Sequence, residues 1–399
     1  MFKHDDFEFG YRIALGSVAR EYADAGEVLA IADRIKDGDA DAWVREWTAA
    51  AEVNEAAAQT AQDAGHRLSA RRYYLRATNY YATGLYLITH SSAPERHGEI
   101  WTRSRAAWDR AVDLLPVPAE RVQIPYEDTT LPGYFFRAPD AHPGERRPLV
   151  VMNNGSDGAT SHLGISGGFG ASDRGYHWLA FDGPGQQSAL FAQGIPFRHD
   201  WEAVLTPVVD EMIKRPDVDA GRIGLIGVSQ AGYWVPRALA FEHRFAAAVA
   251  DPGVIDVSSS WTEQLPGFMR AQLDDPSKKE SFDKEMGWTE RFSKSTRATL
   301  HFRGEPYGLH TDSRYDLYQE VLKYRLGDEV QDITTPLLIT DPEDEQFWPG
   351  QSEQLYEMLT GPRELVKFTA QEGANGHCEP MAPTLRETRI YDWLDGYLA

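Results

Sequence analysis

The chain has 399 residues and a formal net charge of −21, because 61 Asp and Glu outnumber 40 Lys and Arg. Its composition, 42% hydrophobic and 25% charged, is typical of a folded globular protein and excludes wholesale disorder or a fibrous repeat. The length predicts two domains or one large domain with a substantial addition, and so negative a surface repels phosphate backbones, which argues against a nucleic-acid partner.

The first 117 residues are helical in pattern, with apolar residues at spacings of three and four. Trp101 and Trp108 lie seven residues apart on one helix face. We interpret these and the tyrosines between 73 and 86 as helix-packing core, although some could line an aromatic cavity. Helices are predicted over 41–65, 66–88 and 93–115, before the breaker PVPAE at 116–120. We expect a cap-like helical domain over residues 1–117.

Residues 118–399 alternate between buried apolar strands and helices, which predicts an α/β fold with a mostly parallel sheet covered on both faces. The first two strands are close in sequence and could form an antiparallel hairpin. Strands are predicted at 121–126, 133–139, 148–154, 176–182, 222–228, 246–252, 336–340 and 365–370, and helices at 202–215, 230–243, 351–359 and 384–398.

One segment interrupts this alternation. About eighty residues, rich in charge and aromatics, separate the strand near 250 from the strand at 336, which is too long for a plain loop. We predict a helical insertion over about 262–330, with a tail that is helical after Asp312. Together with the N-terminal helices it should form a lid over the site.

The motif RIGLIGVSQAGYW is typical of a nucleophile held on a sharp strand-to-helix turn. A strand ends at Val228, Ser229 follows, and a helix begins at once, so that free amides face the serine oxygen. Gly227 stands where such a turn excludes a side chain. The usual G-x-S-x-G pattern ends here in Ala231, which is small enough for the same packing. The alternative is an ordinary serine in a βα turn.

A nucleophilic serine needs a base and an acid that orients the base. His377 lies in the loop QEGANGHCEP, between the last predicted strand and the final helix, where it can reach over Ser229. The acid should follow the penultimate strand, and the order serine, acid, histidine is that of α/β-hydrolases. That loop offers a choice that the spacing leaves open: Asp341, Glu343, Asp344 and Glu345.

The chain from about 120 to 399 resembles the α/β-hydrolase superfamily. With its helical N-terminal part it is similar to the branch of the fermentation-respiration-switch esterase and 2,6-dihydroxypseudooxynicotine hydrolase. The motifs are NNGSDGATS at 153–161, FDGPGQ at 181–186, GVSQAG at 227–232, the PEDEQ loop and GANGHC at 373–378. In such proteins the triad acid is the last residue of a His-Gly-x-x-Asp segment. The resemblance aligns this segment with residues 341–345, so that the acid falls on Glu345, with Asp344 as the alternative.

The oxyanion hole should take one amide from Gln230 and a second from the loop after strand 148–154, near Gly155 or Ser156. Proteins of this branch often have an acidic residue in this loop that faces the pocket. In the alignment that the resemblance implies, Ser156 occupies the position of that acid. The neighbouring Asp157 is either that pocket acid or a turn former. We interpret FDGPGQ as a turn that shapes the pocket floor, without a catalytic role.

We therefore predict a cofactor-independent serine hydrolase that acts on a small organic molecule through an acyl-enzyme. In this scheme Ser229 attacks a carbonyl carbon, His377 moves the proton and Glu345 orients the histidine. The resemblance implies cleavage of an ester or of a carbon–carbon bond next to a ketone, as the oxynicotine hydrolase cleaves. A peptidase, an acyltransferase and a non-catalytic binding module remain alternatives.

Other chemistries lack their motifs. There is no Cys/His cluster or HExxH for a metal, no phosphate-binding loop, and the glycine-rich stretch 164–175 misses the dinucleotide register. Cys378 is the only cysteine, so no intramolecular disulfide can form, and we interpret it as a packed small residue. With neither a signal peptide nor an apolar run long enough for a bilayer, we expect a cytoplasmic protein without a membrane partner. The resemblance alone implies a homodimer.

Overall fold

The computed structural model describes residues 1–308 and 313–399, and in this part of the chain one eight-stranded sheet organises the fold. Its strand order is β1-β2-β4-β3-β5-β6-β7-β8. The pairs β1–β2 and β2–β4 are antiparallel and the others are parallel, which confirms the predicted mostly parallel sheet and its hairpin. The strands are β1 (Glu120–Tyr126), β2 (Thr129–Phe136), β3 (Arg147–Asn153), β4 (His177–Phe181), β5 (Val218–Val228), β6 (Ala247–Asp251), β7 (Leu337–Pro342) and β8 (Arg363–Phe368).

Each predicted strand corresponds to one of these, but β2 and β5 each begin four residues earlier than predicted. Strand β2 starts at Thr129, since Thr129 already pairs with Tyr126 across a tight turn in which Glu127 has a positive φ of 47°. Strand β5 starts at Val218, but Asp219, Gly221 and Arg222 interrupt the apolar pattern there, so the sequence did not indicate these residues as part of the strand.

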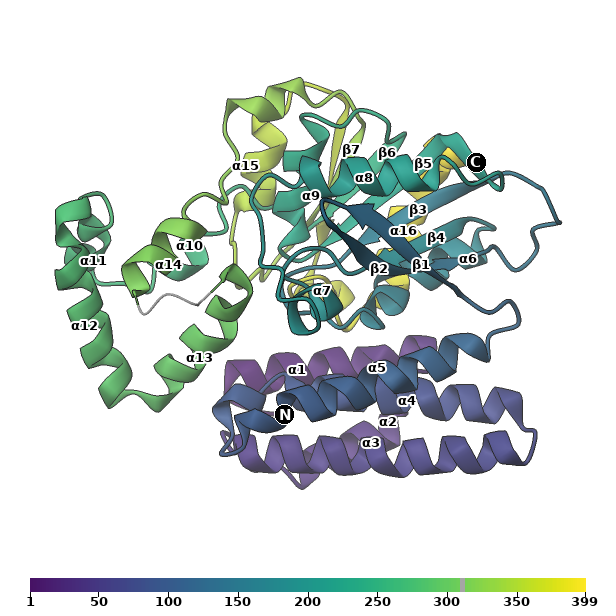
Figure 1. The fold of residues 1–399 in the computed structure, drawn as a ribbon, viewed down its shortest axis with the longest axis horizontal. Coiled ribbons are helices and arrows are strands. Elements are labelled where there is room, and N and C mark those ends of the chain that lie inside the picture. Colours follow the sequence, from purple (N-terminus) through teal and green to yellow (C-terminus); the bar gives the residue numbers. More distant parts are fainter. Residues whose placement is uncertain (309–312) are drawn as a thin grey trace.

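Helices cover both faces of the sheet (Figure 1). One face shares a hydrophobic core with α8 (Glu202–Met212), α9 (Ala231–Leu239) and α15 (Gln351–Met358). The other packs against α6 (Phe169–Asp173), α16 (Pro383–Leu398) and the N-terminal helices, which belong to the same second core. The N-terminal region is therefore fastened to the sheet by shared apolar packing.

The N-terminal helices form a layer along one side of the sheet (Figure 1). Three were predicted individually, and two shorter ones precede them. The buried aromatics include Trp43, Trp47, Tyr80, Tyr81 and Trp108, which agrees with the core interpretation. The helices are α1 (Asp5–Gly16), α2 (Ala25–Asp33), α3 (Ala40–Asp63), α4 (Arg67–Leu85) and α5 (His97–Asp113).

The insertion between β6 and β7 contributes further helices, which extend away from the sheet (Figure 1). Helix α14 starts at Arg314; Asp312, after which the helix was predicted, lies outside the described residues. Helix α13 lies within the predicted helical insertion. It begins after the N-cap Ser293 and reaches the N-terminal region through a 3.2 Å hydrogen bond between Thr299 and His90. The helices are α10 (Ser259–Thr262), α11 (Gly267–Gln272), α12 (Lys279–Phe292), α13 (Lys294–Gly304) and α14 (Arg314–Val321).

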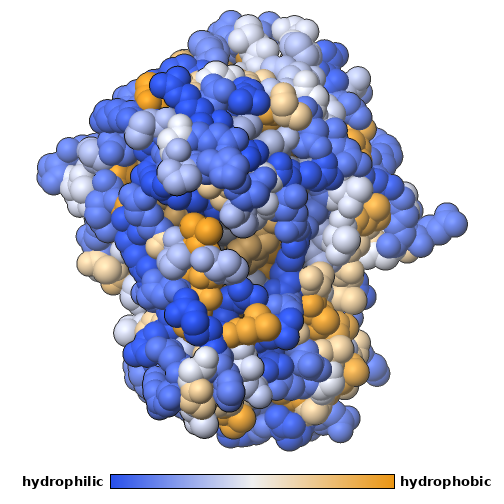
Figure 2. Space-filling model, turned by 90° about the vertical axis from the view of Figure 1, so that its right-hand side faces the viewer, coloured by the Kyte–Doolittle hydropathy of each residue, from blue (hydrophilic) through white to orange (hydrophobic). Residues whose placement is uncertain are grey.

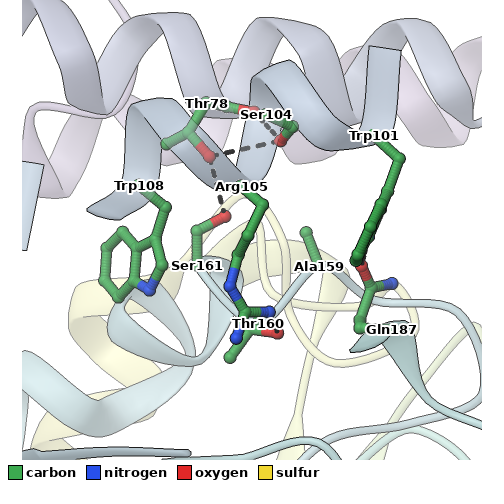
Figure 3. A pocket seen from close by; sticks show the side chains of 9 residues that line it. All are labelled: Thr78, Trp101, Ser104, Arg105, Trp108, Ala159, Thr160, Ser161 and Gln187. Atoms are coloured by element: carbon green, nitrogen blue, oxygen red, sulfur yellow. Dashed lines mark hydrogen bonds between the residues drawn. The ribbon is translucent and has the colours of Figure 1, made fainter. Parts of the chain in front are cut away.

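The seam between the N-terminal helices and the sheet domain is filled by side chains. Its cavity has a volume of about 10 Å³, which holds one water molecule at most (Figure 3). Thr78 on α4 donates a hydrogen bond to Ser161 there, and Trp101 on α5 donates one of 2.9 Å to Gln187 at the start of α7 (Gln187–Phe191). This cavity is a packing seam rather than a substrate site.

Asp182, from the FDGPGQ turn, carries a buried ion pair across this seam. Its carboxylate is 1% exposed and lies 2.8 Å from the Arg105 guanidinium on α5. Thr160 and the Ser188 amide donate to the same carboxylate. The turn therefore does more than shape a floor, because it anchors the helical region to the sheet.

Replacing Arg105 with methionine should lower the free energy of unfolding by about 3 kcal/mol, because it leaves the buried Asp182 carboxylate without its counter-ion. Urea unfolding measures this loss. The double variant Arg105→Met/Asp182→Asn should lose less. Arg121→Met breaks the exposed pairs with Asp109 and Asp113 and should cost at most about 1 kcal/mol. Equal losses in Arg105→Met and Arg121→Met would contradict the anchoring role.

The surface is mostly hydrophilic. On the face drawn in Figure 2, hydrophobic side chains gather in the lower half, where the N-terminal helices meet the sheet domain. No helix in the described ranges combines the length and the apolar character that crossing a membrane requires.

Candidate active site

Three residues from distant parts of the chain form a hydrogen-bonded chain at the carboxyl edge of the sheet. Ser229 follows β5, Glu345 follows β7 and His377 follows β8. The Ser229 Oγ lies 2.8 Å from His377 Nε2, and His377 Nδ1 lies 2.7 Å from Glu345 Oε2. An imidazole that donates from Nδ1 to the carboxylate keeps Nε2 free to accept the serine proton.

The turn that carries Ser229 has the expected strain. Ser229 adopts φ = 60°, a left-handed conformation that costs a non-glycine residue about 1–3 kcal/mol. Its amide donates a 2.6 Å hydrogen bond to the Asp251 carbonyl of β6. A Cβ on Gly227 would lie 2.5 Å from Val235, and one on Gly232 would lie 1.7 Å from the Pro252 carbonyl oxygen. The closest backbone approach thus falls on Gly232, which explains why Ala231 is tolerated in the fifth motif position.

The four candidate acids, Asp341 near the end of β7 and the other three in the loop after it, have separate partners, and only Glu345 contacts His377. Asp341 lies 3.5 Å from Lys367, Glu343 accepts from the Ala370 amide, and Asp344 accepts from Asn375. Glu345 is 8% exposed. Its Oε1 accepts the amides of Phe347 and Trp348 at 2.8 and 3.2 Å, which leaves Oε2 aimed at the imidazole. The geometry favours Glu345 over Asp344.

Burial and mutual attraction act in opposite directions on this pair. Desolvation alone would raise the pKa of Glu345, but His377 and the two backbone amides outweigh it and hold that pKa below the usual value. Desolvation alone would lower the pKa of His377, but Glu345 and, more weakly, Asp251 and Asp157 raise it above its usual 6.5. Glu345 therefore stabilises the imidazolium that a proton transfer from Ser229 would create.

Two backbone amides near the Ser229 hydroxyl have no hydrogen-bond partner among the described residues: those of Gln230 and Ser156. The Gly155 amide, by contrast, donates to Asn154 Oδ1 at 2.9 Å. Of the two predicted loop donors, the geometry therefore favours Ser156. Gly155 instead allows the loop to approach the nucleophile closely, because a Cβ there would lie 2.6 Å from the Ser229 Cβ and 3.1 Å from its Oγ.

Gln186, the last residue of FDGPGQ, holds this loop in place. Its Nε2 donates to the carbonyls of Asn154 and Gly155 at 2.7 and 2.9 Å, and its Oε1 accepts from the Gly183 amide. The motif was visible in the sequence, but this positioning contact was not predicted.

Replacing Gly155 with alanine should lower kcat by about 10²- to 10³-fold, the cost of losing one oxyanion donor, because the added Cβ pushes the loop off the nucleophile. Gly267→Ala on α11 is the matched control, since a Cβ there meets nothing within 4 Å. Steady-state kinetics and the melting temperature should be measured for both variants. A Gly155→Ala enzyme with full activity would refute the close approach.

Aromatic rings surround the imidazole. The rings of Phe347, Trp348 and Phe9 lie 4.7, 5.7 and 6.1 Å from that of His377. Phe9 belongs to α1 and also contacts the ring of Tyr86, just after α4, at 6.0 Å. The N-terminal helices therefore reach the histidine itself, a contact between chain segments that no local sequence signal indicates.

Asp157 and Cys378 are the two other titratable residues near the triad that the sequence singled out, and their surroundings differ. The side chain of Asp157 is solvent-exposed, yet nearby protein atoms desolvate its carboxyl group and raise its pKa. The charges of His377 and Arg303 lower that pKa, but by less. Cys378 donates its thiol to the Asp251 carbonyl at 3.2 Å, and burial raises its pKa well above the usual value, so the sulfur is an unreactive thiol. Within residues 1–308 and 313–399, no group of three or more His, Cys, Asp or Glu could hold a metal ion.

The chain is similar to known hydrolases. Residues 172–305 match the prolyl oligopeptidase family. Hydrolase acrC of Aspergillus aculeatus is 34% identical over 281 residues, 66% of this chain and 65% of that protein. Hydrolase ORFZ of Pyricularia oryzae is 30% identical over 85% of this chain and 82% of its own length. The solved structure of 2,6-dihydroxy-pseudo-oxynicotine hydrolase superposes with a TM-score of 0.75 at 21% identity, over 96% of this chain and 95% of that one.

Proposed function

Because this chain belongs to the α/β-hydrolase superfamily, we propose that it is a serine hydrolase in which Ser229, His377 and Glu345 form the catalytic triad. The observation that carries the proposal is the unbroken chain of short contacts from the serine oxygen to the buried carboxylate. The strained turn at Ser229 supports it, because such strain persists where function requires it.

The reaction follows from the geometry. His377 Nε2 takes the Ser229 proton as the oxygen attacks a carbonyl carbon, and the tetrahedral oxyanion forms beside the free amides of Gln230 and Ser156. His377 then gives its proton to the leaving group, and an acyl group remains on Ser229. Water, deprotonated by His377, releases the acid and restores the serine.

We propose a small organic molecule as the substrate, because Phe9 on α1 lies 6.1 Å from the His377 ring and packs on Tyr86, so the N-terminal helices restrict the approach to the histidine. The bond is an ester or a carbon–carbon bond next to a ketone. With either bond, His377 supplies the proton that the leaving oxygen or carbon must gain.

A fluorophosphonate probe followed by peptide mass spectrometry tests the proposal. We expect an adduct on Ser229 that largely disappears in His377→Ala, and turnover of short-chain esters or β-diketones by the same enzyme. If the triad belongs to a peptidase or an acyltransferase, the enzyme should instead turn over peptides or transfer the acyl group to an acceptor other than water. A folded protein without any adduct on Ser229 would favour a binding module and overturn the proposal.

A further inference from the structure

The insertion helix α13 carries an arginine whose charge has no counter-ion among residues 1–308 and 313–399. Arg303 donates to the Ser260 carbonyl and hydroxyl at 3.2 and 2.8 Å, and its guanidinium lies 4.5 Å from the centre of the Trp261 ring. No carboxylate of the described residues lies within 4.0 Å of it. A guanidinium has five N–H donors, and these bonds use two of them.

A series of contacts connects this arginine to the residue that follows the nucleophile. The Trp261 ring beneath it lies 5.6 Å from that of Tyr307, whose hydroxyl is 3.3 Å from the side-chain oxygen of Gln230, the residue after the nucleophile. The charge of Arg303 also acts on Asp157, which in turn acts on His377. Arg303 is thus linked to the triad in two ways, through Tyr307 and Gln230 and through Asp157 in the loop that carries Ser156.

A shortage of acidic residues does not explain why Arg303 has no carboxylate partner. The chain carries 61 acids for 40 bases, and other partly buried arginines, such as Arg105, Arg237 and Arg314, pair with carboxylates. Desolvation lowers the pKa of Arg303, yet an arginine keeps its charge throughout the usual pH range. A desolvated charge is costly unless it is paired, so a ligand that brings an anion would be bound preferentially.

We propose that Arg303 binds a carboxylate of the substrate and thereby selects molecules that carry an acid group away from the cleaved carbonyl. This inference rests on the proposed function, because it names the substrate class of the same site. The planar guanidinium suits a carboxylate, with which it forms paired, charge-assisted hydrogen bonds. The aromatic rings around it would hold the apolar part of the same molecule.

The test uses two substrates that differ only in charge: mono(4-nitrophenyl) adipate and its methyl ester. Wild type should favour the anionic ester. Arg303→Met should raise KM for the anionic ester by about 10- to 100-fold, the range for a hydrogen bond to a charged group, and leave the neutral ester within about twofold. Arg303→Lys should give a KM for the anionic ester between those of wild type and Arg303→Met, because lysine keeps the charge but lacks the paired donors of the guanidinium.

Two controls separate recognition from structure. Ser260→Ala removes the 2.8 Å bond that holds Arg303 but keeps its charge, so the anionic preference should persist. Arg270→Met removes an exposed charge from α11 and should change neither ester. Equal losses for both esters in Arg303→Met would show a merely structural arginine, and wild type without an anionic preference would overturn the proposal.

Calorimetry of 3-phenylpropionate and 3-phenylpropanamide on the same variants measures recognition without turnover. The acid should bind wild type at least tenfold more tightly than the amide, and Arg303→Met should abolish the difference. If Ser229 is not labelled but this difference is found, the proposed catalysis fails and the carboxylate site stands. If Ser229 is labelled and no difference is found, only the carboxylate site fails.

Discussion

Ser229→Ala should lower kcat by about 10⁴- to 10⁶-fold and leave the protein folded. The variant removes the atom that lies 2.8 Å from His377 Nε2, while the Ser229 backbone bond to Asp251 is kept. His377→Ala should cause a loss of similar size, because the serine proton then has no acceptor. The double variant should be hardly worse than either single one, since the two residues act as a unit.

Ester hydrolysis and fluorophosphonate labelling should be measured together with the melting temperature. Ser281→Ala is the matched control: this serine lies on the exposed side of α12, where its hydroxyl donates a hydrogen bond to Glu285, so its loss should not change the rate. Residual activity of Ser229→Ala above about 1% of wild type would place the nucleophile elsewhere.

The sheet and the position of the nucleophile could be predicted because their signals are local. Strands such as Leu149–Met152 and Ile223–Val228 are fully or nearly fully buried, so their residues form unbroken apolar runs that end at turn residues. The GVSQAG turn needs small residues within a few positions of Ser229. Strand ends were less certain, since polar residues such as Asp219 belong to a strand without forming part of an apolar run.

The acid and the surroundings of the site depend on distant contacts, and there the sequence was less informative. Four acids in one loop look alike until backbone amides of Phe347 and Trp348 single out Glu345. Phe9 on α1 contacts His377, and Arg303 on α13 lies over Trp261; neither residue belongs to a motif. Such pairings depend on how whole helices pack, which helical periodicity alone does not specify.

The choice of Glu345 as the acid leads to the second large effect. Glu345→Gln should lower kcat/KM by about 10⁴-fold, as amide replacement of a triad acid does. The glutamine oxygen can still accept from Phe347 and Trp348, which turns its NH₂ group towards His377 Nδ1. The histidine must then accept at Nδ1 and carry its proton on Nε2, where it can no longer take the serine proton.

The pH profile gives this variant a second, independent measure. In wild type kcat/KM should fall on the acid side of a pKa above 6.5, because Glu345 raises the pKa of His377 and the protonated histidine cannot act as a base. Removing the carboxylate charge removes that contribution, so the acid limb should move to lower pH in Glu345→Gln. Asp344→Asn is the control: its carboxylate contacts Asn375 instead, so both rate and profile should stay within about twofold of wild type. A profile that shifts in Asp344→Asn but not in Glu345→Gln would transfer the role to Asp344.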